Sequence, residues 1–387
     1  MAENNAEKTA RRKSQPAMFN GAPQHDVFPL LHNIYPVAIM APGTDTSPFP
    51  AGPPIDLPAH YDHDGSQDTE AFLTATDTVA LLVLRDGSVR HEYYALTGGP
   101  DVHWISWSVA KSFISALVGI AIDDGHISSV EDPMTDYITG IEGSAYDGVR
   151  IKDVLQMSSG ARWNEDYNDP HSDIARLGAA MSGSSTLARL VAEMVPEHPP
   201  GTLCRYNSGD TQALGSLIAA ATGRPIADYT SEKLFAPLGI EATGYWLTDS
   251  DGMEMAFGGL MLTARDFAKL GELYRLRGVW HGKQLVPAVW VRDSVTADSP
   301  HLTAEANLTN EGMNFGYGYQ WWLGPGERGD YSAIGVYNQF VYVDPDTNVV
   351  IVKLSANRAY GTTTDESSYR EAETLAFLRA VADHVAI

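Results

Sequence analysis

The apolar positions of the chain follow two repeats, one typical of strands and one typical of helices. Residues 78–95 form two runs rich in β-branched and aromatic residues, joined by Asp86-Gly87, which is a strong hairpin signal. Residues 339–355 repeat this pattern, with turn residues at 344–348. The pattern therefore predicts one β-hairpin near each end of the chain.

Helical periodicity dominates between these hairpins. A short helix is predicted to end at Ser159-Gly160, and another to begin at Ser208 or Asp210, either of which could cap it, and to end at Gly223. The other predicted helices cover residues 174–181, 186–195, 225–238, 263–277 and, amphipathic and last, 366–385.

Strands at both ends and helices between them indicate an α+β fold, an antiparallel sheet flanked by helices with an inserted, mostly helical domain. The predicted division is a disordered tail (1–24), an extended, Pro-rich wrapping segment (25–68), a discontinuous sheet domain (69–135 and 256–387) and a helical domain (136–255).

Charge and composition exclude several functions. The 387 residues carry a formal net charge of −23, and basic residues cluster only at Arg11, Arg12 and Lys13, so a nucleic-acid partner is not expected. Cys204 is the single cysteine, which rules out an intrachain disulfide or a cysteine-rich zinc site.

Neither a membrane anchor nor a resident metal or cofactor is expected. The first twenty residues have no apolar stretch typical of an export signal, so we expect a cytoplasmic protein. The longest apolar run, residues 113–122, is too short to cross a bilayer. Residues 59–64 contain HYDHD, but this spacing matches no strong metal motif and reads better as a solvated loop.

The candidate chemistry lies in the stretch 104–125, where Ser108-Val109-Ala110-Lys111 begins a mostly apolar helix that ends before Gly125. Residues three apart share a helix face, so the Lys111 amine can reach the Ser108 hydroxyl. Burial against the apolar flank would lower the lysine pKa and allow it to act as a base. The alternative is a surface lysine on an ordinary helix.

A third group must protonate the leaving atom, and Tyr206, in Tyr206-Asn207-Ser208, is the candidate. The alternative is an aromatic residue that packs on the first turn of the helix it precedes. Other catalytic templates, namely Gly-x-Ser-x-Gly, a P-loop and His-Glu-x-x-His, are absent from the sequence.

Four features in this order carry a resemblance: SVAK at 108–111, IKDVLQMSSGARW, PPGTLCRYNSGDTQALG, and the final hairpin with its helix. The chain from about residue 78 onward resembles the penicillin-recognising (serine β-lactamase-like) hydrolases, on their class C-like side. Within them it is most similar to the 6-aminohexanoate-dimer (nylon oligomer) hydrolases. The resemblance implies a β-lactamase/transpeptidase-like fold, Ser108 as nucleophile, Lys111 as base and Tyr206 as proton relay.

The resemblance also implies an oxyanion hole and shows two departures from the lactamases. Ser208 stands where the lactamases carry Asn, and Gly335 remains from a Lys-Thr-Gly box whose lysine is lost. A role in β-lactam resistance is therefore not expected. The implied oxyanion donors are the backbone N–H groups of Ser108 and Val336, with Ser208 and Gly335 among the substrate-binding residues.

The acidic loop 164–173 is expected to shape the substrate pocket. The resemblance suggests Tyr167 as a ligand of the scissile amide. Relatives efficient on the nylon dimer carry a carboxylate a little further on, whereas residues 174–181 contain no acid. Glu165 and its acidic neighbours could attract a cationic substrate, but a solvated acidic loop fits the same residues.

The sequence thus predicts a metal-free and cofactor-free serine hydrolase that cleaves small linear amides or carboxyl esters through an acyl-enzyme. One alternative is a carboxylesterase without amidase activity. Another, from a different class, is a non-catalytic protein that binds a small molecule. The expected partner is a small-molecule substrate, and a homodimer is possible by analogy with the family.

Overall fold

A computed structural model describes residues 23–166, 169, 171–306, 314–363 and 365–386. A seven-stranded antiparallel sheet forms the centre of the fold, with spatial order β11-β12-β13-β14-β15-β4-β5. In that order its strands are Gly316–Tyr317, Trp322–Leu323, Tyr331–Gly335, Gln339–Asp344, Val349–Ser355, Thr78–Arg85 and Ser88–Tyr94. Both predicted hairpins, β4–β5 and β14–β15, are confirmed, and they lie side by side because β15 pairs with β4.

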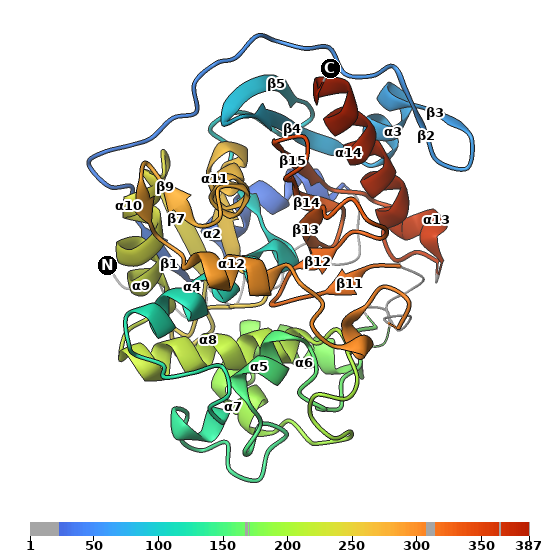
Figure 1. Ribbon diagram of the computed structural model, residues 1–387. Helices are drawn as coiled ribbons and strands as arrows, with labels where there is room; N and C mark the ends of the chain where they lie inside the picture. The colour runs from blue at the N-terminus through green and yellow to red at the C-terminus, as the bar shows by residue number, and fades with distance from the viewer. Residues whose placement is uncertain (1–22, 167–168, 170, 307–313, 364, 387) are drawn as a thin grey trace.

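The two faces of this sheet carry different helices. Alternate residues point to opposite faces, so Leu82 and Val350 join the core that also holds α11 (Ala264–Arg275), whereas Leu81 and Ile351 join the core under α14 (Glu371–Ala386). Figure 1 shows α14, in red, and α11, in gold, on the two sides of the sheet. The mixture of helices with an antiparallel sheet confirms the predicted α+β class.

A second sheet, of four strands, ends in the strand that precedes the candidate site. Its order is β1-β7-β8-β6, with strands Val37–Met40, Gly244–Leu247, Leu260–Leu262 and Trp104–Ile105. The edge strand β6 is followed by a single 3-10 turn, Trp107–Val109, and then by the buried helix α4, Ala110–Asp123. This order places Ser108 at the junction of a strand and a helix.

The green helices below the sheets in Figure 1 form the helical part of the molecule. They are α5 (Ile151–Leu155), α6 (Asp173–Met181), α7 (Leu187–Ala192) and α8 (Ser208–Thr222). The predicted capping of α8 by Ser208 or Asp210 is wrong, because the Asn207 side chain accepts from the backbone N–H groups of Gly209 and Asp210. The left-handed Gly223 ends the helix, as predicted.

The remaining α-helices and strands are short. They are α2 (Leu31–Ile34), α3 (Thr69–Ala75), α9 (Ile226–Thr230), α10 (Ala236–Leu238), α12 (Ala288–Ser294), α13 (Glu366–Tyr369) and the hairpins β2–β3 (His60–Asp62, Ser66–Asp68) and β9–β10 (Val279–Trp280, Lys283–Gln284). The HYDHD residues lie in and around β2. Within the described ranges, no helix combines the length and apolarity needed to cross a membrane.

The segment before β1 packs on the turn that carries Ser108. Phe28 is fully buried, and its ring meets three aromatic rings edge-on at centroid distances of 5.6, 5.3 and 5.1 Å, those of Trp104, Trp107 and Tyr337. Trp107 precedes the serine, and Tyr337 belongs to the β13–β14 turn. Phe28 therefore contacts both the turn that carries Ser108 and the turn between β13 and β14.

Candidate functional site

Ser108 lies on a backbone turn that few residues would adopt. Trp107, directly before it, has φ of 44°, a left-handed conformation that is strained for a bulky side chain. The Trp107 side chain is 3% exposed and packs against Phe28, which holds the turn in this shape. Residues so strained concentrate at functional sites. No sequence pattern predicted this turn, because tryptophan is not a residue that favours positive φ.

The predicted pair of Ser108 and Lys111 is brought together. Lys111 Nζ lies 3.1 Å from Ser108 Oγ, 3.0 Å from Ser208 Oγ and 2.9 Å from the Phe257 carbonyl oxygen. The Lys111 side chain is 2% exposed. Burial is the main influence on it and lowers the pKa of Lys111 to about 7, although the nearby Glu165 acts in the opposite direction. Near neutral pH this amine can therefore exist as a free base.

Tyr206 stands beside this pair, just before α8. Lys111 Nζ lies 5.1 Å from the centre of the Tyr206 ring, and Ser108 lies near enough to Tyr206 to influence the pKa of its hydroxyl. The ring stacks on Trp322 at 5.1 Å and meets Tyr317 edge-on at 6.2 Å. Burial, more than the charge of Glu165, raises the pKa of Tyr206 well above its ordinary value, so the phenol keeps its proton at neutral pH.

The end of β13 approaches the serine turn closely at Gly335. A Cβ atom at this position would lie 2.7 Å from the Ser106 carbonyl oxygen and 3.0 Å from the Ser108 nitrogen, so the contact requires glycine. Val336 follows Gly335 and lines the same cavity as Ser108. The strand thus places the backbone of residues 335–336 against the Ser108 amide.

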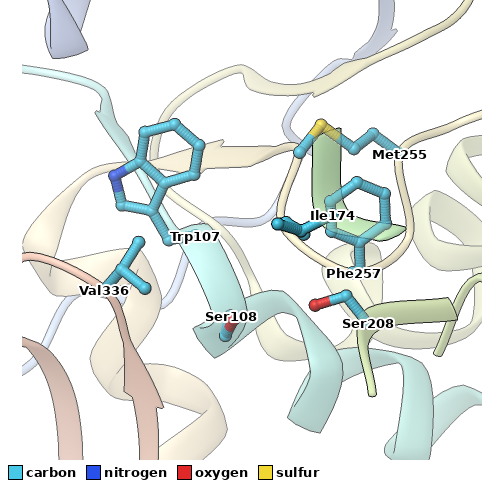
Figure 2. A pocket seen from close by; sticks show the side chains of 8 residues that line it. Trp107, Ser108, Ile174, Ser208, Met255, Phe257 and Val336 are labelled. Atoms are coloured by element: carbon cyan, nitrogen blue, oxygen red, sulfur yellow. The ribbon is translucent and has the colours of Figure 1, made fainter. Parts of the chain in front are cut away.

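The cavity over Ser108 is mainly apolar. Ser208 also lines it, and the remaining lining residues are Trp107, Ile174, Met255, Phe257, Gly258 and Val336. Figure 2 shows the Ser208 hydroxyl turned toward Ser108, with Met255 and Phe257 on one side of the opening and Trp107 on the other. None of these lining residues carries a charge.

Glu165 is a member of the site whose place the sequence analysis missed. Its carboxylate accepts from the Ser208 hydroxyl at 2.6 Å, from the Ser208 backbone N–H at 3.2 Å and from the Trp163 indole N–H. The acidic loop was interpreted as solvated or substrate-attracting, and no spacing rule links Glu165 to Ser208, 43 residues later. Tyr167, predicted to contact the substrate, lies outside the described residues.

Of the residues described, no group of three or more His, Cys, Asp or Glu side chains is placed to hold a metal ion.

The chain is similar to known proteins over most of its length. The family described as Beta-lactamase matches residues 67–376. The 6-aminohexanoate-dimer hydrolase of Paenarthrobacter ureafaciens is 32% identical over 296 residues, which cover 75% of each chain.

Solved structures show the same fold. A Bacillus anthracis protein assigned provisionally as a 6-aminohexanoate-dimer hydrolase superposes with a TM-score of 0.84 at 22% identity, covering 95% of this chain and 96% of its own. The hydrolase EstCE1, described as having promiscuous acyltransferase activity, gives a TM-score of 0.64 at 17% identity, over 81% of this chain and 96% of its own. The family match and the identity to the Paenarthrobacter hydrolase support an amide or ester hydrolase, and the chain belongs to the beta-lactamase family.

Proposed function

We propose that the protein is a serine hydrolase that cleaves small, neutral carboxyl esters and linear amides through an acyl-enzyme on Ser108. The observation that carries the proposal is the buried Lys111 amine, 3.1 Å from the Ser108 hydroxyl and with its pKa lowered to about 7. The similarity to the 6-aminohexanoate-dimer hydrolase of Paenarthrobacter ureafaciens supports hydrolysis as the reaction class.

In the proposed reaction, Ser108 Oγ bonds to the substrate carbonyl carbon while its proton moves to Lys111 Nζ. The backbone N–H groups of Ser108 and Val336 hold the oxyanion. The bond to nitrogen or oxygen then breaks, and the leaving amine or alcohol receives the proton from Lys111 through the Tyr206 hydroxyl. Water then attacks the acyl carbon and passes a proton through Tyr206 to Lys111. The bond from the acyl carbon to Ser108 Oγ breaks, Oγ takes the proton from Lys111, and the carboxylic acid leaves.

The oxyanion hole leads to a prediction at Gly335. Gly335→Ala adds a methyl group where the Ser106 oxygen and the Ser108 nitrogen leave no room, so β13 must move away from the serine turn. Because losing one oxyanion donor typically costs 10²–10³ in kcat, we expect a fall of about that size. Steady-state kinetics on p-nitrophenyl acetate measure it, with circular dichroism to confirm folding. The control is Gly178→Ala on α6, where the added carbon meets no atom within 4 Å; equal kcat in both variants would contradict the prediction.

The apolar cavity favours a neutral acyl group over a cationic one. Among the described residues that line it, none offers a carboxylate to an ammonium group. We therefore expect turnover of p-nitrophenyl acetate and butyrate, slower turnover of the matching anilides, and hydrolysis of the linear 6-aminohexanoate dimer at least about tenfold slower than that of a neutral amide of the same length, a difference of ~1.4 kcal/mol.

This substrate series also separates the alternatives. Ester turnover without any amide turnover would identify a carboxylesterase. Failure of all the esters and amides, together with measurable binding of them, would favour a non-catalytic binding protein. Dimer hydrolysis faster than that of the neutral amide would overturn the proposed substrate preference.

A further inference from the structure

Glu165, Ser208 and Lys111 form a continuous hydrogen-bonded chain beneath the cavity. Ser208 Oγ lies 2.6 Å from Glu165 Oε1 and 3.0 Å from Lys111 Nζ. The carboxylate is itself fixed, since its second oxygen accepts from the Ser208 backbone N–H and from the Trp163 indole. Hydrogen bonds to both carboxylate oxygens therefore fix the Glu165 side chain beside the Ser208 hydroxyl.

The direction of these hydrogen bonds follows from the chemistry of the groups. A carboxylate accepts and does not donate, so the Ser208 hydroxyl hydrogen points at Glu165. Ser208 Oγ can then act toward Lys111 as an acceptor alone. The Phe257 carbonyl, 2.9 Å from Lys111 Nζ, is also an acceptor alone.

A neutral lysine amine has two N–H bonds and one lone pair. Ser208 and the Phe257 carbonyl take the two N–H bonds, which leaves the lone pair for the third neighbour, Ser108 Oγ at 3.1 Å. Once Lys111 has gained the serine proton, its three N–H bonds have the same three oxygens as acceptors. The proton can therefore move without any rearrangement of these groups.

We propose that Glu165 is a positioning residue that acts through Ser208 to aim the Lys111 lone pair at the Ser108 hydroxyl. This inference rests on the proposed function, in which Lys111 is the base. Without the negative charge at residue 165, the Ser208 hydrogen is free to turn toward the Lys111 lone pair and to draw it away from Ser108.

The charge of Glu165 gives a second effect that can be measured separately. Among the described residues, two face the Lys111 amine with an ionisable side chain: Glu165, from the loop before α6, and Tyr206, from the segment before α8. Asp210 on α8 hydrogen-bonds to Tyr146 and Ser159 instead. Glu165 raises the pKa of Lys111 against the larger effect of burial, so its neutralisation should lower that pKa further.

The experiment measures the rate of acylation by p-nitrophenyl acetate in single turnovers as a function of pH. For Glu165→Gln we expect the acylation rate at high pH, where it no longer changes, to be about tenfold lower, equivalent to ~1.4 kcal/mol on the barrier. The midpoint of the rise in rate with pH should also move to lower pH. For Ser208→Ala we expect a similar loss of plateau rate, and for the double variant no further loss. Glu193→Gln, which removes an exposed carboxylate that pairs with Arg189 at 2.6 Å at the end of α7, should retain the wild-type rate.

Ser208→Thr is the rescue variant, because its hydroxyl can accept from Lys111 and donate to Glu165. We expect it to regain most of the rate lost in Ser208→Ala, and this comparison decides the question even if Glu165→Gln does not fold. Losses that multiply in the double variant, a wild-type plateau in Glu165→Gln, or no rescue by threonine would each overturn the positioning role. These results leave the proposed function intact, whereas acylation that persists in Ser108→Ala would refute that function itself.

Discussion

Ser108→Ala is expected to abolish the acyl-enzyme and to lower hydrolysis of p-nitrophenyl acetate by at least about 10³-fold, because removal of the nucleophile leaves only the oxyanion donors and substrate binding. The wild-type protein should gain one acetyl group within a single turnover, visible as a shift in intact mass, and release nitrophenol in a burst. The variant should show neither the mass shift nor the burst.

The control for this experiment is Ser112→Ala, four residues further along α4. Ser112 is even more buried than Ser108, and its hydroxyl donates to the Gln320 carbonyl oxygen at 2.7 Å, outside the site. This variant should keep both the burst and the adduct, with the acetyl group mapped to the peptide that contains Ser108. An adduct of wild-type size in Ser108→Ala would disprove the assignment of the nucleophile.

The parts of this fold that could be predicted from the sequence depend on local patterns. Residues 78–95 and 339–355 carry the period of a strand and a clear turn, and both form hairpins. Ser108 and Lys111 belong to one helical turn, so their contact follows from spacing alone. Burial of Lys111 could also be expected, because apolar residues follow it for almost three turns.

The parts that could not be predicted depend on tertiary packing. Trp107 adopts a left-handed conformation because the ring of Phe28, almost 80 residues earlier, and the close approach of Gly335 surround it. Glu165 reaches Ser208 across 43 residues, a distance at which no periodicity exists. The sequence pointed to Ser208 or Asp210 as the cap of α8, whereas Asn207, whose backbone is extended, is the residue that caps it.

The second large effect is expected at Lys111, in the pH dependence of kcat/KM. The lysine acts as a base only when it is neutral, and burial lowers its pKa to about 7. The rate should therefore rise with pH, with its midpoint close to 7, and fall by about tenfold for each pH unit below that value. Deprotonation of Tyr206 should cause no fall in rate up to about pH 10, because burial raises the pKa of Tyr206 well above that of a free phenol.

Lys111→Met tests the origin of this profile, since it removes the amine but keeps a long apolar side chain. Loss of a general base typically costs 10²–10⁴ in rate, so we expect a fall of about that size and a residual rate without the limb near pH 7. Measurement of kcat/KM between about pH 5 and 10 for both proteins, with an ester that is stable over this range, gives the comparison. A wild-type rate that stays level across pH 7, or a limb that persists after Lys111 is replaced, would show that another group accepts the Ser108 proton. A lost limb with folding retained would instead identify the buried amine as the base, because Lys111 is the group in contact with Ser108 whose pKa lies in that range.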